Sequence, residues 1–185
     1  NDSTSVTFGT TEYSAITNWT SAGDMGTDTW ANQNADNKNV LRAETTVGGL
    51  KVSISQNVAA NVASATSDPI SLTIGGALGG ASYVIASEGS KMGIAATTAV
   101  GGATVTTAYS TAPSIETTLP VVAQNAVKTA HATSMNASTG VKIAYPMGAV
   151  VTTASYVMES NGTGQTAGTL LKDSWNIAAV WTSGA

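Results

Sequence analysis

Strict alternation of apolar and polar side chains, interrupted by paired glycines, limits what this chain can fold into. The alternation is clearest in Val40–Asn57, which reads VLRAETTV-GG-LKVSISQN. A period of two sends successive side chains to opposite faces of a β-sheet. Gly48 and Gly49 can adopt the positive φ that a two-residue hairpin turn requires. We therefore predict a hairpin with one apolar face and one charged, hydroxyl-rich face.

The same unit recurs along the chain and predicts an all-β meander of about ten strands. The other expected elements are a strand ending at Val6–Gly9, hairpins turning at Gly79-Gly80, at Gly101-Gly102 and at Pro146-Met147-Gly148, and a last strand over Ser174–Thr182. Short glycine turns mostly alternate with long polar connections, and Glu88-Gly89-Ser90 is the exception. Short turns at one end and long loops at the other are typical of outer-membrane barrels.

The composition suits extended structure with small side chains. Charged residues make up 10% of the 185 residues, against roughly a quarter in typical globular proteins. The net charge of −4 argues against nucleic acid as a partner, because that partner needs a basic surface. The absence of cysteine excludes disulfides and thiolate metal sites. No run of about 18 apolar residues is present, which excludes a transmembrane helix but not transmembrane strands of about 9–11 residues.

Several short stretches occur in an order that points to a known family. They are Phe8-Gly9, Ser21-Ala22-Gly23-Asp24-Met25, Val40-Leu41-Arg42 before the glycine turn, and Gly140-Val141-Lys142-Ile143-Ala144-Tyr145-Pro146-Met147-Gly148. In this order they resemble the general diffusion porins of alphaproteobacterial outer membranes. The resemblance implies a 16-stranded antiparallel up-and-down transmembrane β-barrel. It also implies a homotrimer, embedded in the lipid and lipopolysaccharide of a Gram-negative outer membrane, that passes small hydrophilic solutes and ions by diffusion.

The resemblance also implies that one long loop folds into the barrel and narrows the pore. The matching segment here is Thr11–Asn39, a polar stretch with no sustained period. Two features depart from the family. About ten strands are too few for a 16-stranded barrel, and the chain ends Trp-Thr-Ser-Gly-Ala without a terminal aromatic residue. We therefore expect residues 1–185 to be a single porin domain that is incomplete at both ends.

A diffusion pore needs a wet lumen and a field between separated acidic and basic side chains. The pore-lining candidates are Glu12, Asp24, Asp28, Asp36 and Lys38 on the loop, and Arg42, Glu44, Lys51 and Lys142 on the polar faces of strands. The alternative is that these charges lie on an ordinary solvated surface. The opposite face is expected to contact lipid through Leu41, Leu50, Val52, Ile54, Leu72, Ile74, Ile85, Ile94, Val105, Ile143, Trp175 and Trp181.

Enzymatic function is not expected, and no catalytic residue is predicted. His131, the only histidine, has no obvious acidic neighbour, and no Gly-x-Ser-x-Gly motif is present. No cofactor or specific metal site is expected. Calcium between the loop carboxylates is the one conceivable metal, since hard cations prefer oxygen ligands, but Asp24-x-x-x-Asp28 does not match the spacing of an EF-hand.

A second reading of the alternation stays open. One-sided alternation is also the pattern of a soluble β-sandwich. The rival is a secreted or surface β-rich structural protein, such as an adhesin, a fibre subunit or a phage structural protein. It would be soluble without detergent, or it would polymerise through its edge strands.

Overall fold

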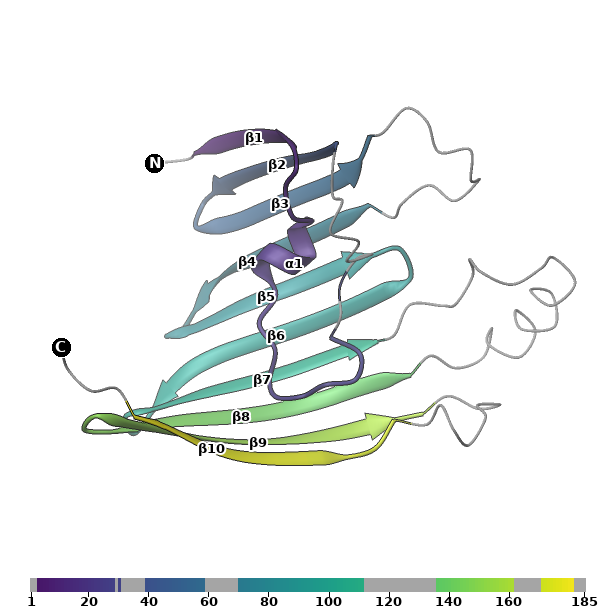
Figure 1. Cartoon of the computed structure of the whole chain (residues 1–185). Coiled ribbons are helices and arrows are strands. Elements are labelled where there is room, and N and C mark those ends of the chain that lie inside the picture. Colours follow the sequence, from purple (N-terminus) through teal and green to yellow (C-terminus); the bar gives the residue numbers. More distant parts are fainter. Residues whose placement is uncertain are drawn as a thin grey trace, which may run out of the picture.

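The computed structural model describes residues 3–28, 30, 39–58, 70–111, 136–161 and 171–181. The strands are β1 (Thr4–Gly9), β2 (Val40–Val47), β3 (Leu50–Asn57), β4 (Ser71–Leu78), β5 (Ala81–Glu88), β6 (Lys91–Val100), β7 (Ala103–Thr111), β8 (Ala137–Met147), β9 (Val150–Ser160) and β10 (Ser174–Trp181), and the helix is α1 (Ser14–Asn18). The ten strands form one antiparallel sheet in the order of the sequence, from β1 to β10 (Figure 1). The prediction of an all-β, up-and-down meander of about ten strands is confirmed.

Tight turns join the strands of each predicted hairpin. In the Val40–Asn57 hairpin, Gly48 and Gly49 have φ values of 58° and 83°, and Val47 pairs with Leu50 beside them. Both residues lie in the left-handed region, where a side chain would be strained, so glycine fits this turn. The same left-handed conformation recurs at Gly79-Gly80 and at Gly101-Gly102.

Of the turn predicted at Pro146-Met147-Gly148, only Gly148 lies in the observed turn. Pro146 and Met147 belong to β8 and pair with β9, and the turn consists of Gly148 and Ala149. A proline fits here because the pairing of β8 with β7 ends at Ala144. Beyond that residue, β8 pairs only with β9 in the described ranges, so the missing N–H of proline interrupts no described ladder on the other side.

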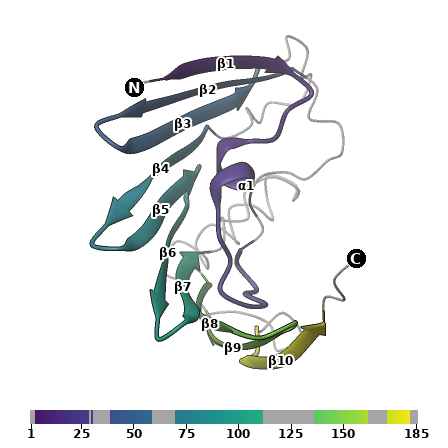
Figure 2. The same cartoon turned by 90° about the vertical axis from the view of Figure 1, so that its left-hand side faces the viewer.

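The two faces of the sheet differ in side-chain size and polarity. The sheet curves around α1 and the segment that follows it, which defines a concave and a convex face (Figure 2). One row across the concave face consists of Glu44, Ser53, Thr73, Ala86, Gly93, Ser110, Ser138 and Glu159. A neighbouring row on the convex face contains Val52, Ile74, Ile85, Ile94, Tyr109 and Met158. The apolar residues predicted to contact lipid all lie on the convex face.

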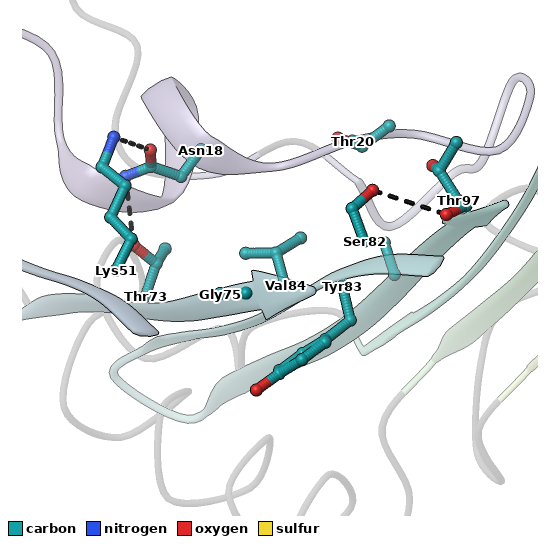
Figure 3. A pocket seen from close by; sticks show the side chains of 11 residues that line it. Asn18, Thr20, Lys51, Thr73, Gly75, Ser82, Tyr83, Val84 and Thr97 are labelled. Carbon is teal, nitrogen blue, oxygen red and sulfur yellow. Dashed lines mark hydrogen bonds between the residues drawn. The ribbon is translucent and has the colours of Figure 1, made fainter. Parts of the chain in front are cut away.

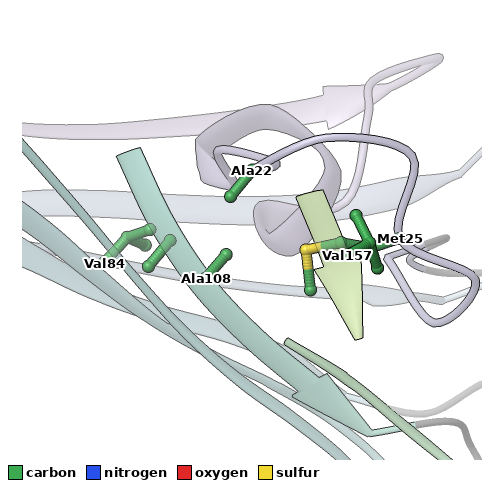
Figure 4. Close-up of a cluster of buried hydrophobic side chains, with 6 residues drawn as sticks. Ala22, Met25, Val84, Ala108 and Val157 are labelled. Atoms are coloured by element: carbon green, nitrogen blue, oxygen red, sulfur yellow. The ribbon is translucent and has the colours of Figure 1, made fainter. Parts of the chain in front are cut away.

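The hydrophobic core lies between the concave wall and the segment that follows β1, which we call the inward segment (Thr11–Asp28 and Trp30). One buried cluster joins Ala22 and Met25 of this segment to Val84, Ala108 and Val157 of the wall (Figure 4). A second cluster contains Ala15, Trp30 and Ala86, with Ile16 and Trp19 packed against it. In the described ranges, no second sheet covers the convex face. No helix in these ranges is long and apolar enough to cross a membrane.

Candidate functional site

The first turn of α1 is held against the wall by serine hydroxyls. The residue before the helix, Tyr13, makes no side-chain cap. Instead, the backbone N–H groups of Ser14 and Ala15 donate to the hydroxyls of Ser55 and Ser71, at 2.8 and 2.9 Å. These N–H groups have no partner within the helix itself, so the wall supplies the acceptors that a capping residue usually provides.

The far end of the inward segment is anchored in the same way to β7, β8 and β9. The N–H of Gly26 donates to Glu159 Oε1 at 2.8 Å, and the N–H of Thr27 donates to Ser138 Oγ at 3.1 Å. The hydroxyl of Thr27 donates to the backbone carbonyl of Ser110 at 2.8 Å. Ser138 in turn donates to Glu159. The segment therefore spans the concave face from β3 to β9 and is fixed at both ends.

Wall glycines let the segment lie directly on the strand backbone. A Cβ atom at Gly140 would stand 2.3 Å from the carbonyl oxygen of Ala22. A Cβ atom at Gly93 would stand 2.7 Å from the ring of Trp19 and 2.9 Å from the ring of Trp30. Neither contact leaves space for alanine, so these positions set how close the segment comes to the wall.

Charged residues gather where α1 meets β2 and β3. Arg42 donates to Thr17 Oγ1 at 2.7 Å and to the backbone carbonyl of Glu12 at 3.1 Å. Glu44 lies between two cations, with 3.0 Å to Lys51 Nζ and 3.6 Å to Arg42 Nε. The predicted residues Arg42, Glu44 and Lys51 thus form one network on the concave face. Two cations and one carboxylate leave this part of the wall positive.

The other predicted site residues are spread over the concave side. Asp24 is exposed, while Asp28 is half-buried and accepts a hydrogen bond from Ser21. Both belong to the part of the segment that packs on β7, β8 and β9, away from the cations of β2 and β3. Lys142 is half-buried on the concave face. Asp36 and Lys38 lie outside the described residues, as does His131. The described ranges contain no group of three or more His, Cys, Asp or Glu side chains that could hold a metal ion.

A cavity of about 270 Å³ lies on the concave face beside α1 (Figure 3). Its lining includes the polar side chains of Asn18, Thr20, Lys51, Thr73, Ser82 and Thr97, together with Gly75, Gly76, Tyr83, Val84 and Ala95. Asn18 connects two of them, because it accepts from Lys51 Nζ at 2.9 Å and donates to Thr73 Oγ1 at 3.1 Å. Hydroxyl, amide and ammonium groups of this kind suit water and small polar solutes. None of them is an activated nucleophile.

Two features of the site were not predicted from the sequence. The first is that serine hydroxyls of the wall are buried and bond to the inward segment. The sequence showed only that these residues alternate with apolar ones. The second is Lys91, which is buried and whose Nζ donates to the backbone carbonyl of Thr27. Its signal was the short connection Glu88-Gly89-Ser90, which breaks the pattern of long loops at that end of the sheet.

Comparisons with known proteins do not assign the chain to a family. No family model, no curated protein and no solved structure matches it. The resemblance to porins therefore stays a prediction, and the function is argued from the geometry.

Proposed function

We propose that this chain forms the wall of an outer-membrane β-barrel channel for passive diffusion of small hydrophilic solutes and ions. The observation that carries the proposal is the distribution of side chains over the two faces. Large exposed apolar side chains lie mainly on the convex face, which no other element covers in the described ranges. The charged side chains of the strands and the buried hydroxyls lie on the concave face. A soluble β-protein would bury its large apolar face instead.

The convex face has the character of a lipid-contacting surface. Trp175, Ile177 and Phe8 are 75%, 68% and 65% exposed. Soluble monomers rarely leave extended apolar surface open to water. The outside of a membrane barrel is an apolar band with aromatic residues at its borders, and its strands alternate between this band and a polar interior.

The concave face has the character of a water-filled lumen with a constriction. The inward segment would narrow the lumen, with Arg42 and Lys51 on one side and Asp24 and Asp28 on the other. Opposed charges of this kind tune ion selectivity in pores. The barrel would close when β1 and β10 find strand partners, and a homotrimer embedded in lipid and lipopolysaccharide is the assembly that the porin resemblance implies. The proposal assigns the chain no catalytic step and no cofactor.

Conductance in planar lipid bilayers tests the proposal. The full-length protein, purified in detergent, should insert and give stepwise, ohmic openings. A heat-denatured sample of the same preparation is the control for leakage caused by detergent. A protein that folds, stays soluble without detergent and never conducts would rule the channel out.

The rival reading, a secreted or surface β-rich structural protein, is favoured by one observation. Within the described residues, β1 and β10 each have a strand partner on one side only. Open edges of this kind can pair with other chains and produce polymers. Sedimentation without detergent distinguishes the two readings, because the rival predicts soluble monomers or regular polymers, and the channel predicts aggregation that detergent reverses.

A further inference from the structure

One tight turn lies at the end of the sheet where the other connections are long. Gly89 and Ser90 join β5 to β6, while the neighbouring connections at that end run from Val58 to Ile70 and from 112 to 136. The strand residues on either side of the turn, Glu88 and Lys91, pair with each other. Both are buried, at 7% and 2% exposed. The carboxylate of Glu88 and the ammonium group of Lys91 therefore flank the turn on the concave face, where other parts of the protein bury them.

Lys91 makes its contacts with the last described residues of the inward segment. Its Nζ donates to the backbone carbonyl of Thr27. The same atom lies 4.6 Å from the ring centre of Trp30, in the position of a cation–π contact. Glu88 and Asp28 provide negative charge nearby. A lysine as buried as this one is stabilised only by such partners.

The ring of Trp30 packs between the wall and the indole ring of Trp19. It is 2% exposed, and its centre lies 4.9 Å from that of Trp19. Gly93, two residues after Lys91 on the same face of β6, leaves the space that both rings fill. On β6, Gly93 therefore lies against the ring of Trp30, and the ammonium group of Lys91 contacts the same ring.

We propose that Lys91 is a latch that holds Thr27, Asp28 and Trp30 against the wall and thereby sets the width of the channel. This inference rests on the proposed channel function. Lys91 is a positioning residue: it does not touch solute, and it acts through the place of the inward segment. Without the latch, only the bonds of Gly26 and Thr27 to Glu159, Ser138 and Ser110 would hold this end of the segment, so it would leave the wall more often. The hydroxyls of β3 and β4 would still hold α1.

The absence of cysteine allows a direct test. A single Met25→Cys substitution puts a thiol at a segment position that is 3% exposed and outside the latch. The latch is released by Lys91→Met combined with Glu88→Gln, so that no buried carboxylate loses its partner. A desolvated cation–π contact and a hydrogen bond from a charged donor each shift an equilibrium by about tenfold. Labelling by a charged methanethiosulfonate should therefore become at least roughly tenfold faster, and the single-channel conductance should rise.

The matched control is Lys142→Met, which removes a lysine from the same face. Within the described residues, Lys142 makes no hydrogen bond or ion pair with the inward segment. Its removal should leave the labelling rate unchanged. Trp30→Leu breaks the latch from the segment side, and it carries the test if the Lys91 variant does not assemble.

The outcomes separate the latch from the channel. Unchanged labelling and conductance in both latch variants would overturn the latch, even if the wild-type protein conducts. Faster labelling in the latch variants, with no conductance in any sample, would support the latch and overturn the channel.

Discussion

The sharpest test of the convex face compares arginine at two positions of one strand. Ile54 lies near the middle of β3, and Leu50 is its first residue, next to the glycine turn. Both side chains point to the convex face, and they are 45% and 43% exposed. If the face lies in water, the two positions are equivalent. If it lies in lipid, they differ in depth.

The expected difference follows from the geometry of the strand. Four residues at about 3.3 Å per residue separate the two positions by about 13 Å. Because strands of membrane barrels tilt by about 35–45°, the two positions would differ in depth by about 10 Å, within an apolar band about 25 Å tall. Ile54→Arg near the midplane should therefore cost about 2–4 kcal/mol of unfolding free energy, and Leu50→Arg near the interface about 0–1 kcal/mol. On a solvated surface both substitutions should stay within about 0.5 kcal/mol.

The assay is urea unfolding of the wild type and both variants from lipid vesicles, followed by tryptophan fluorescence. The wild-type transition must be reversible, so that free energies can be compared. A cost at Ile54 at least about 1 kcal/mol larger than that at Leu50 is expected. Equal and small costs at both positions would refute the assignment of this face to lipid.

Two further predictions concern the concave face. Gly140→Ala should lower the thermal midpoint and change the conductance, because the new Cβ would stand 2.3 Å from the carbonyl oxygen of Ala22 and overpacking costs about 1–3 kcal/mol. The control is Gly76→Ala, whose Cβ would meet mainly the side-chain ends of Leu50 and Tyr83. Equal effects at both glycines would contradict the argument. Lys51→Leu should fold normally and shift the reversal potential in a salt gradient toward cation selectivity, because Glu44 loses its cation. An unchanged reversal potential would place Lys51 outside the ion path.

The hairpins and the two faces could be predicted from the sequence because they depend on local rules. Alternation fixes which side chains share a face once a strand is recognised. Paired glycines mark the turns at Gly48-Gly49, Gly79-Gly80 and Gly101-Gly102, whereas the pair Gly75-Gly76 lies inside β4. Arg42, Glu44 and Lys51 came together for the same reason, since they alternate on two strands of one hairpin. The error at Pro146 has a non-local cause, the point at which pairing with β7 ends.

The course of the inward segment could not be predicted, because its contacts join distant parts of the chain. Gly26 bonds to Glu159, which lies 133 residues later. The acceptors on the wall are serine and threonine, and these occur on most strands of this chain, so their identity does not mark which of them are used. Lys91 could not be assigned for a related reason. A lysine at a turn usually points to water, and only the contacts of Lys91 with Thr27 and Trp30 show otherwise.

The small, hydroxyl-rich side chains of the concave face meet two separate demands. Away from the segment, Thr104 and Thr153 are exposed or half-buried, so their hydroxyls can form hydrogen bonds with water. Beneath the segment, at Ser53, Ser55 and Ser138, they are buried and bond to its backbone or side chains. Irregular backbone inside a protein must find hydrogen-bond partners, and an apolar wall could not provide them. A concave face rich in hydroxyls therefore makes an inward segment physically possible, and the large apolar side chains lie mainly on the convex face.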